Sequence, residues 1–326
     1  MRSKLFQRRF VVVAGKGGVG RSTVCVALGL AAARYGLRTC IVQLNTQDDV
    51  ARLFGCEAGS YAPVQLDPDL LLFAANLRPT EALREYGQLK LRWKALHHLV
   101  FENDVMRRLL RMVPGMSEML LLGKAWHMEA RERRDDGTPV WDLLIVDAPA
   151  TGHGISLLRL PQVILDAVPV GPMAEDARRM KELLEDPLRS SFHVVTLPQE
   201  LPATEAIELC ELAQTTLDVP TGYLFINAVL PRLLGETQRR LLLHAEPTVG
   251  ETQVRQALQS VEAYEHWREA QQAQVQRLRR AVHLPVVELP YVFERMDRTQ
   301  VELLSQAAVA SMETTDTRRR VGEGAR

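Results

Sequence analysis

The chain has 326 residues, and its 40 lysines and arginines balance 40 aspartates and glutamates, so its formal net charge is zero. A protein that binds DNA or RNA through the phosphates usually carries a basic excess, so this balance argues against a nucleic-acid partner. The content of 46% hydrophobic and 25% charged residues is that of an ordinary globular domain, and no apolar run reaches the roughly 20 residues that span a bilayer, which predicts a soluble, cytoplasmic protein without an integral membrane segment.

Short apolar runs alternate with longer helical patterns along the chain, which predicts an α/β fold with a doubly wound, mostly parallel sheet covered on both faces. Several runs are apolar almost throughout, as strands buried on both faces must be. The expected strands are 10–14, 39–44, 70–74, 143–147, 192–197, 223–227 and 286–289. The expected helices lie at about 22–36, 79–97, 102–113, 116–133, 171–185, 203–217, 251–281 and 299–311.

The order of these elements predicts a single domain over residues 1–312 that carries one helical insertion. The insertion is expected at about 79–139, where the chain shows no strand pattern although a crossover helix needs only a dozen or so residues. Residues 313–326 are basic and contain glycine, so we expect them to form a flexible tail.

A phosphate-binding loop is the sharpest local pattern. Residues 10–23 read FVVVAGKGGVGRST, which matches the motif G-x-x-x-x-G-K-[ST] except that Arg21 stands at the lysine position. The glycines let backbone N–H groups surround a phosphate, and the helix that follows adds the positive end of its dipole. We therefore expect ATP or ADP here, with the Ser22 hydroxyl on Mg²⁺ and Thr23 on the α-phosphate. The expected nucleotide-binding residues of the loop are Gly15, Lys16, Gly17, Gly18, Val19, Gly20, Arg21, Ser22 and Thr23.

Two segments together resemble one ATPase family. The early lysine, Lys16, makes the loop similar to the deviant P-loop of MinD, ParA, nitrogenase-iron-protein and ArsA-type ATPases. Residues 141–154, WDLLIVDAPATGHG, resemble the D-T-A-P-T-G-H switch II signature of the ArsA-type family, which includes arsenite-pump ATPases and the targeting ATPase for tail-anchored membrane proteins. Similar residues continue over roughly 8–312. The resemblance implies a SIMIBI-like P-loop NTPase fold.

The resemblance also implies site residues in a dimeric enzyme that uses ATP and Mg²⁺. Lys16 would reach across the dimer and stabilise transition-state charge on the partner's phosphates, as an arginine finger does. Asp147 would hold the Mg²⁺ shell through water, and the switch II residues would change contacts with the nucleotide. The remaining implied residues are Thr151, Gly152 and His153 in switch II, Asn227 on the adenine edge and Pro290 on the adenine ring.

Two departures from the family pattern predict a weakened hydrolytic site. Arg21 keeps the positive charge, but a planar guanidinium is bulkier than the compact lysine ammonium between β- and γ-phosphate oxygens. Asn45 stands in switch I where the family has its water-orienting aspartate, when the segment is anchored on Phe54 and Gly55. An amide cannot take up a proton, and a positioned base contributes ~10²–10⁴-fold. Asp48 or Asp49 would substitute only if the loop runs differently.

The cysteines separate this chain from three better-known kinds of relative. Cys25, Cys40, Cys56 and Cys210 include no C-x-x-C pair, so no zinc clamp of the kind that joins eukaryotic targeting ATPases is expected. They also do not match the metalloid-binding set of arsenite pumps, nor the cluster ligands of the nitrogenase iron protein. No zinc or arsenite site is therefore expected.

These features favour a protomer that keeps a trans-acting lysine and loses part of its own hydrolytic site. Its expected partner is a paralogous ArsA-type subunit in a heterodimer, or a second copy in a homodimer. A protein or membrane-directed client is expected from the family, and the leucine- and methionine-rich segment 109–122 fits either an adaptable groove or core packing. The alternatives are a nucleotide-sensing scaffold without hydrolysis and a MinD/ParA-like positioning ATPase. The neutral charge and the short polar tail argue against the latter.

Overall fold

The computed structural model describes residues 3–46, 50–56, 59–90, 115–149, 154–235, 237–238, 240 and 252–323. In this part of the chain eight strands form one sheet in the order β3-β4-β2-β5-β1-β6-β7-β8, with β3 antiparallel to β4 and the other pairs parallel. The expected α/β class is confirmed. The strands are β1 (Phe10–Ala14), β2 (Thr39–Leu44), β3 (Val64–Gln65), β4 (Leu72–Leu77), β5 (Leu143–Asp147), β6 (Ser190–Thr196), β7 (Thr221–Val229) and β8 (Val286–Pro290).

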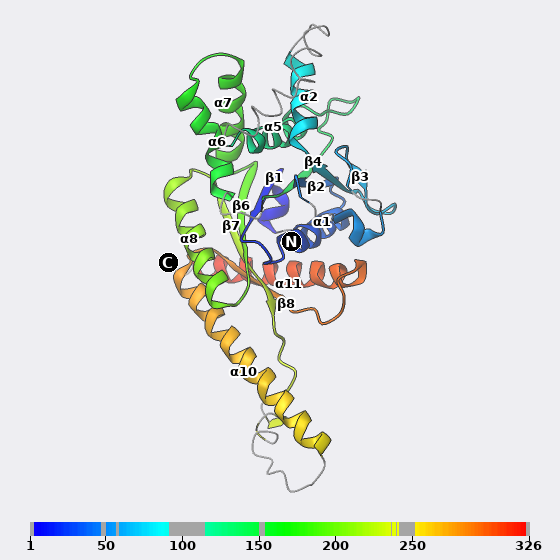
Figure 1. Cartoon of the computed structure of the whole chain (residues 1–326), viewed down its shortest axis with the longest axis vertical. Coiled ribbons are helices and arrows are strands. Elements are labelled where there is room, and N and C mark those ends of the chain that lie inside the picture. Colours follow the sequence, from blue (N-terminus) through cyan, green and yellow to red (C-terminus); the bar gives the residue numbers. More distant parts are fainter. Residues whose placement is uncertain are drawn as a thin grey trace.

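Helices cover both faces of this sheet (Figure 1). Strand residues alternate between the faces, so in β1 Phe10 and Val12 enter one core while Val11 and Val13 enter the other. The first core is closed by α5, α6, α7, α8 and α10, and the second by α1 and α11. The helices are η1 (Lys4–Gln7), α1 (Arg21–Arg34), η2 (Val50–Phe54), α2 (Pro79–Lys90), α5 (Met116–Ala130), α6 (Gly154–Ala167), α7 (Pro172–Glu185), α8 (Glu200–Thr216), α10 (Thr252–Ala281) and α11 (Arg298–Glu323).

The structure differs from the sequence prediction at one edge of the sheet. The edge strand β3 was not expected, because two exposed residues carry no periodic pattern. The strand expected at 70–74 begins two residues later as β4, since the Asp67 side chain accepts a hydrogen bond from the Asp69 N–H (2.9 Å) and forms a turn just before it.

The flexible tail expected from residue 313 is wrong for residues 313–323, which continue α11. Met312 is fully buried at the end of the expected helix. One turn later the Tyr223 hydroxyl donates to Asp316 Oδ1 (2.5 Å), and Thr315 Oγ1 donates to the Val286 carbonyl (3.1 Å). These contacts with β7 and β8 hold the helix on the sheet beyond the point where its apolar pattern fades.

The insertion expected at about 79–139 is described only in part. Its first segment forms α2 and its later segment forms α5, which packs against α2, α6 and α7 on the face of the first core. Residues 91–114 lie outside the described residues, so a helical subdomain stays a prediction there. Arg133 and Pro139 form an isolated antiparallel bridge before the chain enters β5.

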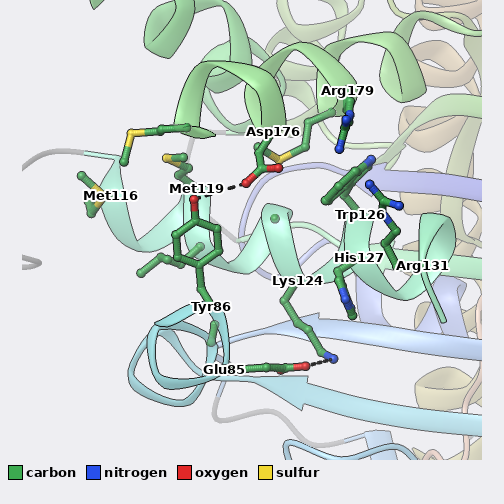
Figure 2. A pocket seen from close by; sticks show the side chains of 15 residues that line it. Glu85, Tyr86, Met116, Met119, Lys124, Trp126, His127, Arg131, Asp176 and Arg179 are labelled. Atoms are coloured by element: carbon green, nitrogen blue, oxygen red, sulfur yellow. Dashed lines mark hydrogen bonds and ion pairs between the residues drawn. The ribbon is translucent and has the colours of Figure 1, made fainter. Parts of the chain in front are cut away.

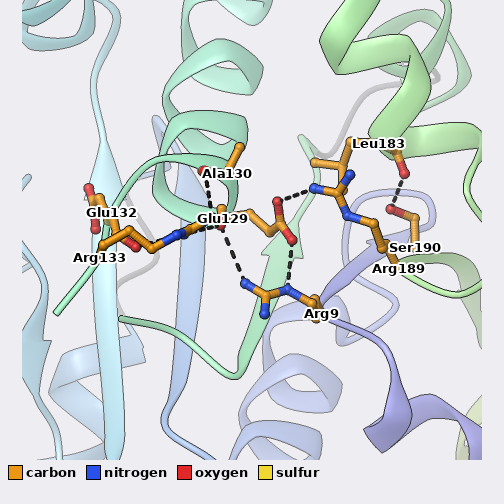
Figure 3. Close-up of polar contacts among 8 residues, drawn as sticks. All are labelled: Arg9, Glu129, Ala130, Glu132, Arg133, Leu183, Arg189 and Ser190. Atoms are coloured by element: carbon orange, nitrogen blue, oxygen red, sulfur yellow. Dashed lines mark hydrogen bonds and ion pairs between the residues drawn. The ribbon is translucent and has the colours of Figure 1, made fainter. Parts of the chain in front are cut away.

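A buried carboxylate fixes α5 to the amino-terminal ends of two central strands (Figure 3). Glu129 is 2% exposed. Its Oε1 accepts from Arg9 Nε (2.7 Å) and its Oε2 from Arg189 Nη2 (2.6 Å). Arg9 directly precedes β1 and Arg189 directly precedes β6. The carboxylate therefore joins three segments that are far apart in sequence.

We expect Glu129→Ala to lower the free energy of unfolding by about 2 kcal/mol, below the roughly 3–5 kcal/mol of a fully buried pair because both arginines can be hydrated. Glu185→Ala is the matched control, because Glu185 forms an (i, i+4) surface pair with Lys181 (3.1 Å), a class worth roughly 0.5 kcal/mol or less. Urea unfolding of both variants measures the difference. Equal losses would mean that the Glu129 cluster adds nothing beyond a surface pair.

The buried histidine His193 on β6 is held in its neutral form. It is 1% exposed, and burial, with the charge of Arg8 adding to it, lowers the pKa of His193 to about 3. Its Nδ1 accepts from the Tyr223 N–H (2.9 Å), so Nε2 carries the proton and donates to Ser191 Oγ (2.8 Å). A histidine in this tautomer cannot take a proton from Ser191.

His193 is expected to make stability depend on pH. An unfolded histidine with a pKa of about 6.5 binds a proton as the pH falls from 7 to 5, whereas the folded one does not, so the free energy of unfolding should drop by about 2 kcal/mol over this range. Urea unfolding of the wild type and of His193→Gln at both pH values tests this. The decrease in the free energy of unfolding between pH 7 and pH 5 should be smaller in the variant by about 2 kcal/mol. An equal decrease in both proteins would contradict the assignment of this effect to His193.

Candidate nucleotide-binding site

The loop between β1 and α1 lies at the carboxyl end of β1, between β5 and β6, where the connections diverge to the two sides of the sheet. Ligands of doubly wound folds bind at such a point. Gly15 passes so close to β6 that a Cβ would come within 2.4 Å of the Val195 carbonyl oxygen. Gly18 and Gly20 have φ values of +83° and +85°, which favour glycine. No side chain caps the start of α1.

Ser22 and Asp147 meet at the mouth of this loop although they come from different elements. Ser22 lies in the first turn of α1 and Asp147 is the last residue of β5. The Ser22 hydroxyl donates to Asp147 Oδ2 over 2.6 Å. Hydroxyl and carboxylate oxygens are ligands that Mg²⁺ accepts. The pair therefore fits the ion expected here, with Ser22 as a direct ligand and Asp147 acting through water. Thr23 follows in the same turn of α1.

Arg21, which replaces the usual lysine, points its guanidinium at the backbone of a neighbouring strand end. Its Nη1 donates a hydrogen bond to the carbonyl oxygen of Ala148, the residue directly after Asp147. Ala148 is buried and Arg21 is partly exposed, so the contact is partly shielded from solvent. The Arg21 guanidinium therefore points toward the segment after β5 that leads to the expected switch II.

Lys16 forms an ion pair within its own chain. Its Nζ contacts Glu205 Oε1 on α8, and the two side chains are 54% and 23% exposed. The Lys16 side chain thus lies over the surface beside α8 and is more than half exposed. The interaction with Glu205 was not predicted, because Glu205 is 189 residues away in the sequence.

Asn227 and Pro290, the residues expected at the adenine, lie near the ends of β7 and β8. The Asn227 amide donates to the Val19 carbonyl (3.0 Å), and a Cβ on Gly20 would come within 2.2 Å of the same nitrogen. Asn227 therefore supports the phosphate loop directly. Pro290 is exposed and pairs in register with Val229. Their contacts with adenine stay predictions.

Buried polar side chains frame the start and the end of the expected switch I. Asn45 is exposed and adopts the left-handed conformation with φ +52°. Asn76 on β4 holds the next residue from both sides, donating to the Thr46 carbonyl (2.8 Å) and accepting from its N–H (3.3 Å). Gln43 accepts from the Val50 N–H (3.1 Å). The sequence did not lead us to expect these roles of Asn76 and Gln43. A polar residue near the end of an otherwise apolar strand would have pointed to them.

The switch II residues and the alternative acids of switch I fall in segments that the structure does not describe. Thr151, Gly152 and His153 lie outside the described residues, as do Asp48 and Asp49. Their roles stay predictions from the family resemblance.

The cysteines are mainly packed inside the protein. Cys25, Cys40 and Cys210 are buried and Cys56 is partly exposed. Burial raises the pKa of the Cys25 and Cys40 thiols well above the usual value. Over the ranges that the structure describes, no three His, Cys, Asp or Glu side chains gather to hold a metal ion. None of the helices described has the length and apolarity needed to cross a bilayer.

Comparison with known proteins identifies the family. Residues 8–170 match the ArsA family, described as anion-transporting ATPases. The ATPase BagA of Mycobacterium tuberculosis is 27% identical over 330 residues, covering 94% of each chain. The arsenical pump-driving ATPase of Acidiphilium multivorum is 27% identical over 247 residues, which cover 70% of this chain and 40% of that protein. The ATPase ASNA1 homolog 1 of Paramecium tetraurelia is 27% identical over 161 residues, covering 48% of this chain and 44% of that protein.

The family match begins just before β1 and ends after α6, so it contains the phosphate loop, the Ser22–Asp147 pair and the segment after β5. The ordered glycine loop, the mostly parallel sheet and the matched sequence agree with one another. This chain belongs to the ArsA family of ATPases.

Proposed function

We propose that this chain is the nucleotide-binding but hydrolytically weak subunit of a dimeric ArsA-type switch. Its partner is a paralogous subunit with an intact ATP site, and Lys16 completes that site from across the dimer. The chain's own site binds ATP or ADP with Mg²⁺ and regulates the dimer. The switch acts in the cytoplasm on a protein or membrane-directed client.

The observation that carries the proposal is the hydrogen bond from Arg21 to the Ala148 carbonyl. In P-loop ATPases the residue at this position supplies a positive charge between the β- and γ-phosphates. Here the guanidinium is engaged with the backbone, and Asn45 provides an amide where a carboxylate would orient water. Both features reduce transition-state stabilisation, while the glycine loop and the Ser22–Asp147 pair remain suited to binding.

A trans role for Lys16 is supported by its exposure and by the weakness of its restraint. More than half of the side chain is accessible, and its ion pair with Glu205 is partly exposed. Exposed pairs of this kind contribute at most about 1 kcal/mol. A partner's phosphates could therefore draw Lys16 away from Glu205 at little cost.

Turnover measurements test this function directly. The isolated chain should bind a fluorescent ATP analogue in the presence of Mg²⁺ and hydrolyse ATP slowly. Adding an ArsA-type paralogue that has lysine and aspartate at the two altered positions should raise turnover above the sum of the separate rates. Full cooperative turnover by the isolated chain would contradict the pairing, and unchanged rates on mixing with ATP binding intact would favour a nucleotide-sensing scaffold.

A further inference from the structure

A pocket of about 280 Å³ lies between α2, α5 and α7 (Figure 2), and none of the residues that line it belongs to the phosphate loop. Four methionines from two helices line it, together with the ring of Trp126 and the open side of Gly123. Methionine side chains adapt to apolar ligands and make favourable contacts with aromatic groups. The lining methionines are Met116, Met119, Met173 and Met180.

One side of the pocket is closed by a satisfied network of charges. Lys124 Nζ donates to Glu85 Oε1 (2.8 Å) and to Glu132 Oε1 (3.0 Å), and the Tyr61 hydroxyl donates to Glu85 Oε2 (2.7 Å). Burial works against both charges, but the hydrogen bonds between them outweigh it, so the pKa of Lys124 is raised and that of Glu85 is lowered. Lys124 and Glu85 therefore both stay ionised and remain paired with each other.

Another part of the lining has polar groups that can form further hydrogen bonds. His127 Nδ1 is buried and has no hydrogen-bond partner among the described residues. Burial, with the charge of Lys124 adding to it, lowers the pKa of His127, so the ring is neutral. Arg131 lies beside Trp126, 6.0 Å from the ring centre, and Arg179, drawn above the indole in Figure 2, also forms an exposed ion pair with Glu175 (3.5 Å).

The arginines of the lining are the groups that can meet an anion. Lys124 is already paired with Glu85 and Glu132, whereas Arg179 uses one nitrogen for Glu175 (3.5 Å) and keeps its other N–H donors, and Arg131 lines the same part of the pocket. Asp176 accepts a hydrogen bond from the Tyr86 hydroxyl (3.2 Å).

The size of the pocket limits what can occupy it. The volume of about 280 Å³ is close to the roughly 300 Å³ at which small-molecule pockets begin, so a small ligand with an apolar body fits this space. One turn of an α-helix with its side chains, about 10 Å wide and 5.4 Å long, occupies about 400 Å³ and fits it less well.

We propose that this pocket binds a small amphipathic carboxylate. Its apolar body lies among the methionines and against Trp126, and its carboxylate meets Arg131 and Arg179 at the mouth. Arginine suits this role because its planar fork can donate two hydrogen bonds to one carboxylate. The site is separate from the nucleotide site, so binding is expected without ATP.

Binding is tested with decanoate on the full chain without nucleotide. Calorimetry should show binding of decanoate and at least about tenfold weaker binding of decanol and decylamine, a ratio that corresponds to about 1.4 kcal/mol. ω-Bromodecanoate should quench tryptophan fluorescence by contact. Trp126→Phe should remove most of the quenching, whereas Trp267→Phe, which changes a tryptophan outside the pocket lining that is 46% exposed, should leave it.

Two further variants separate the site from general hydrophobic binding. Gly123→Leu should abolish decanoate binding, because a Cβ on Gly123 is 3.9 Å from Met180 Sδ and the larger side chain then extends into the cavity. Arg179→Gln should weaken decanoate binding about tenfold and leave decanol unchanged. Arg178→Gln is the matched control, because Arg178 is the exposed neighbour on α7 and does not line the pocket.

Several outcomes would overturn the proposal. They are the absence of decanoate binding, equal binding of decanol, or decanoate binding that survives in a folded Gly123→Leu protein. Tight binding of an apolar helical peptide that competes with decanoate would equally reject a small carboxylate as the occupant. Gly123→Ala, which adds one methyl group at ordinary contact distance, checks that α5 tolerates substitution.

Discussion

Lys16→Ala is expected to lower ATP turnover by the mixed dimer by about 10³-fold while this chain keeps its own nucleotide affinity within a few-fold, because a cation supplied in trans contributes ~10³–10⁵ to phosphoryl transfer. The loss should appear at the paralogue's site, since Lys16 is exposed on the surface beside its own loop. Steady-state turnover of the purified mixture measures the effect.

Two controls make this result specific. Lys181→Ala removes another partly exposed lysine that pairs with a glutamate, here at 3.1 Å on α7, and should leave turnover unchanged. Glu205→Gln releases Lys16 without removing it and should leave turnover equal or higher. Unchanged turnover after Lys16→Ala, with mixed dimers still forming on a sizing column, would reject the trans role.

The second large effect is a gain of function. Replacing Arg21 by lysine and Asn45 by aspartate together should raise ATP turnover of the isolated chain by about 10²-fold, the lower end of what a positioned base contributes. Arg21→Lys would free the Ala148 carbonyl and return a compact ammonium to the phosphate loop. Asn45→Asp should fold normally, because aspartate tolerates the left-handed conformation that Asn45 adopts.

The two single variants and a substitution at a distant arginine are the controls for the double variant. Each single change should give less than the pair, because charge placement and water orientation act on the same step. Arg34→Lys, at the far end of the same helix, should change nothing. If the double variant binds MgATP but hydrolyses it no faster than the wild type, the weak hydrolysis has a cause outside these two positions.

Much of the fold could be predicted because its signals are local. The strand predictions at 10–14, 39–44 and 143–147 agree with β1, β2 and β5 residue for residue, since central parallel strands are apolar throughout. The edge strand β3 and the extension of α11 were missed, because two-residue strands have no period and because contacts with the sheet hold the last turns of α11.

The buried role of Gln271 shows the same limit in a helix. It lies in a glutamine-rich stretch of α10 that is typical of a solvated surface, yet it is 3% exposed. Its Oε1 accepts from the Leu230 N–H (2.8 Å), which ties the long helix to the end of β7. The composition of such a stretch indicates its average exposure to solvent. Which single side chain of the stretch faces inward depends on how the helix packs.

By itself, the sequence determined the family, the α/β class and the phosphate loop, because each depends on residues close together along the chain, where steric and periodic rules apply directly. Only the tertiary structure decided how distant side chains meet. It turned Arg21 to a carbonyl 127 residues away, paired Lys16 with Glu205, and anchored Glu129 between two strands. The physical reason is that such contacts depend on how the strands order and the helices pack, and that order is set by burial over the whole chain and not by any local pattern.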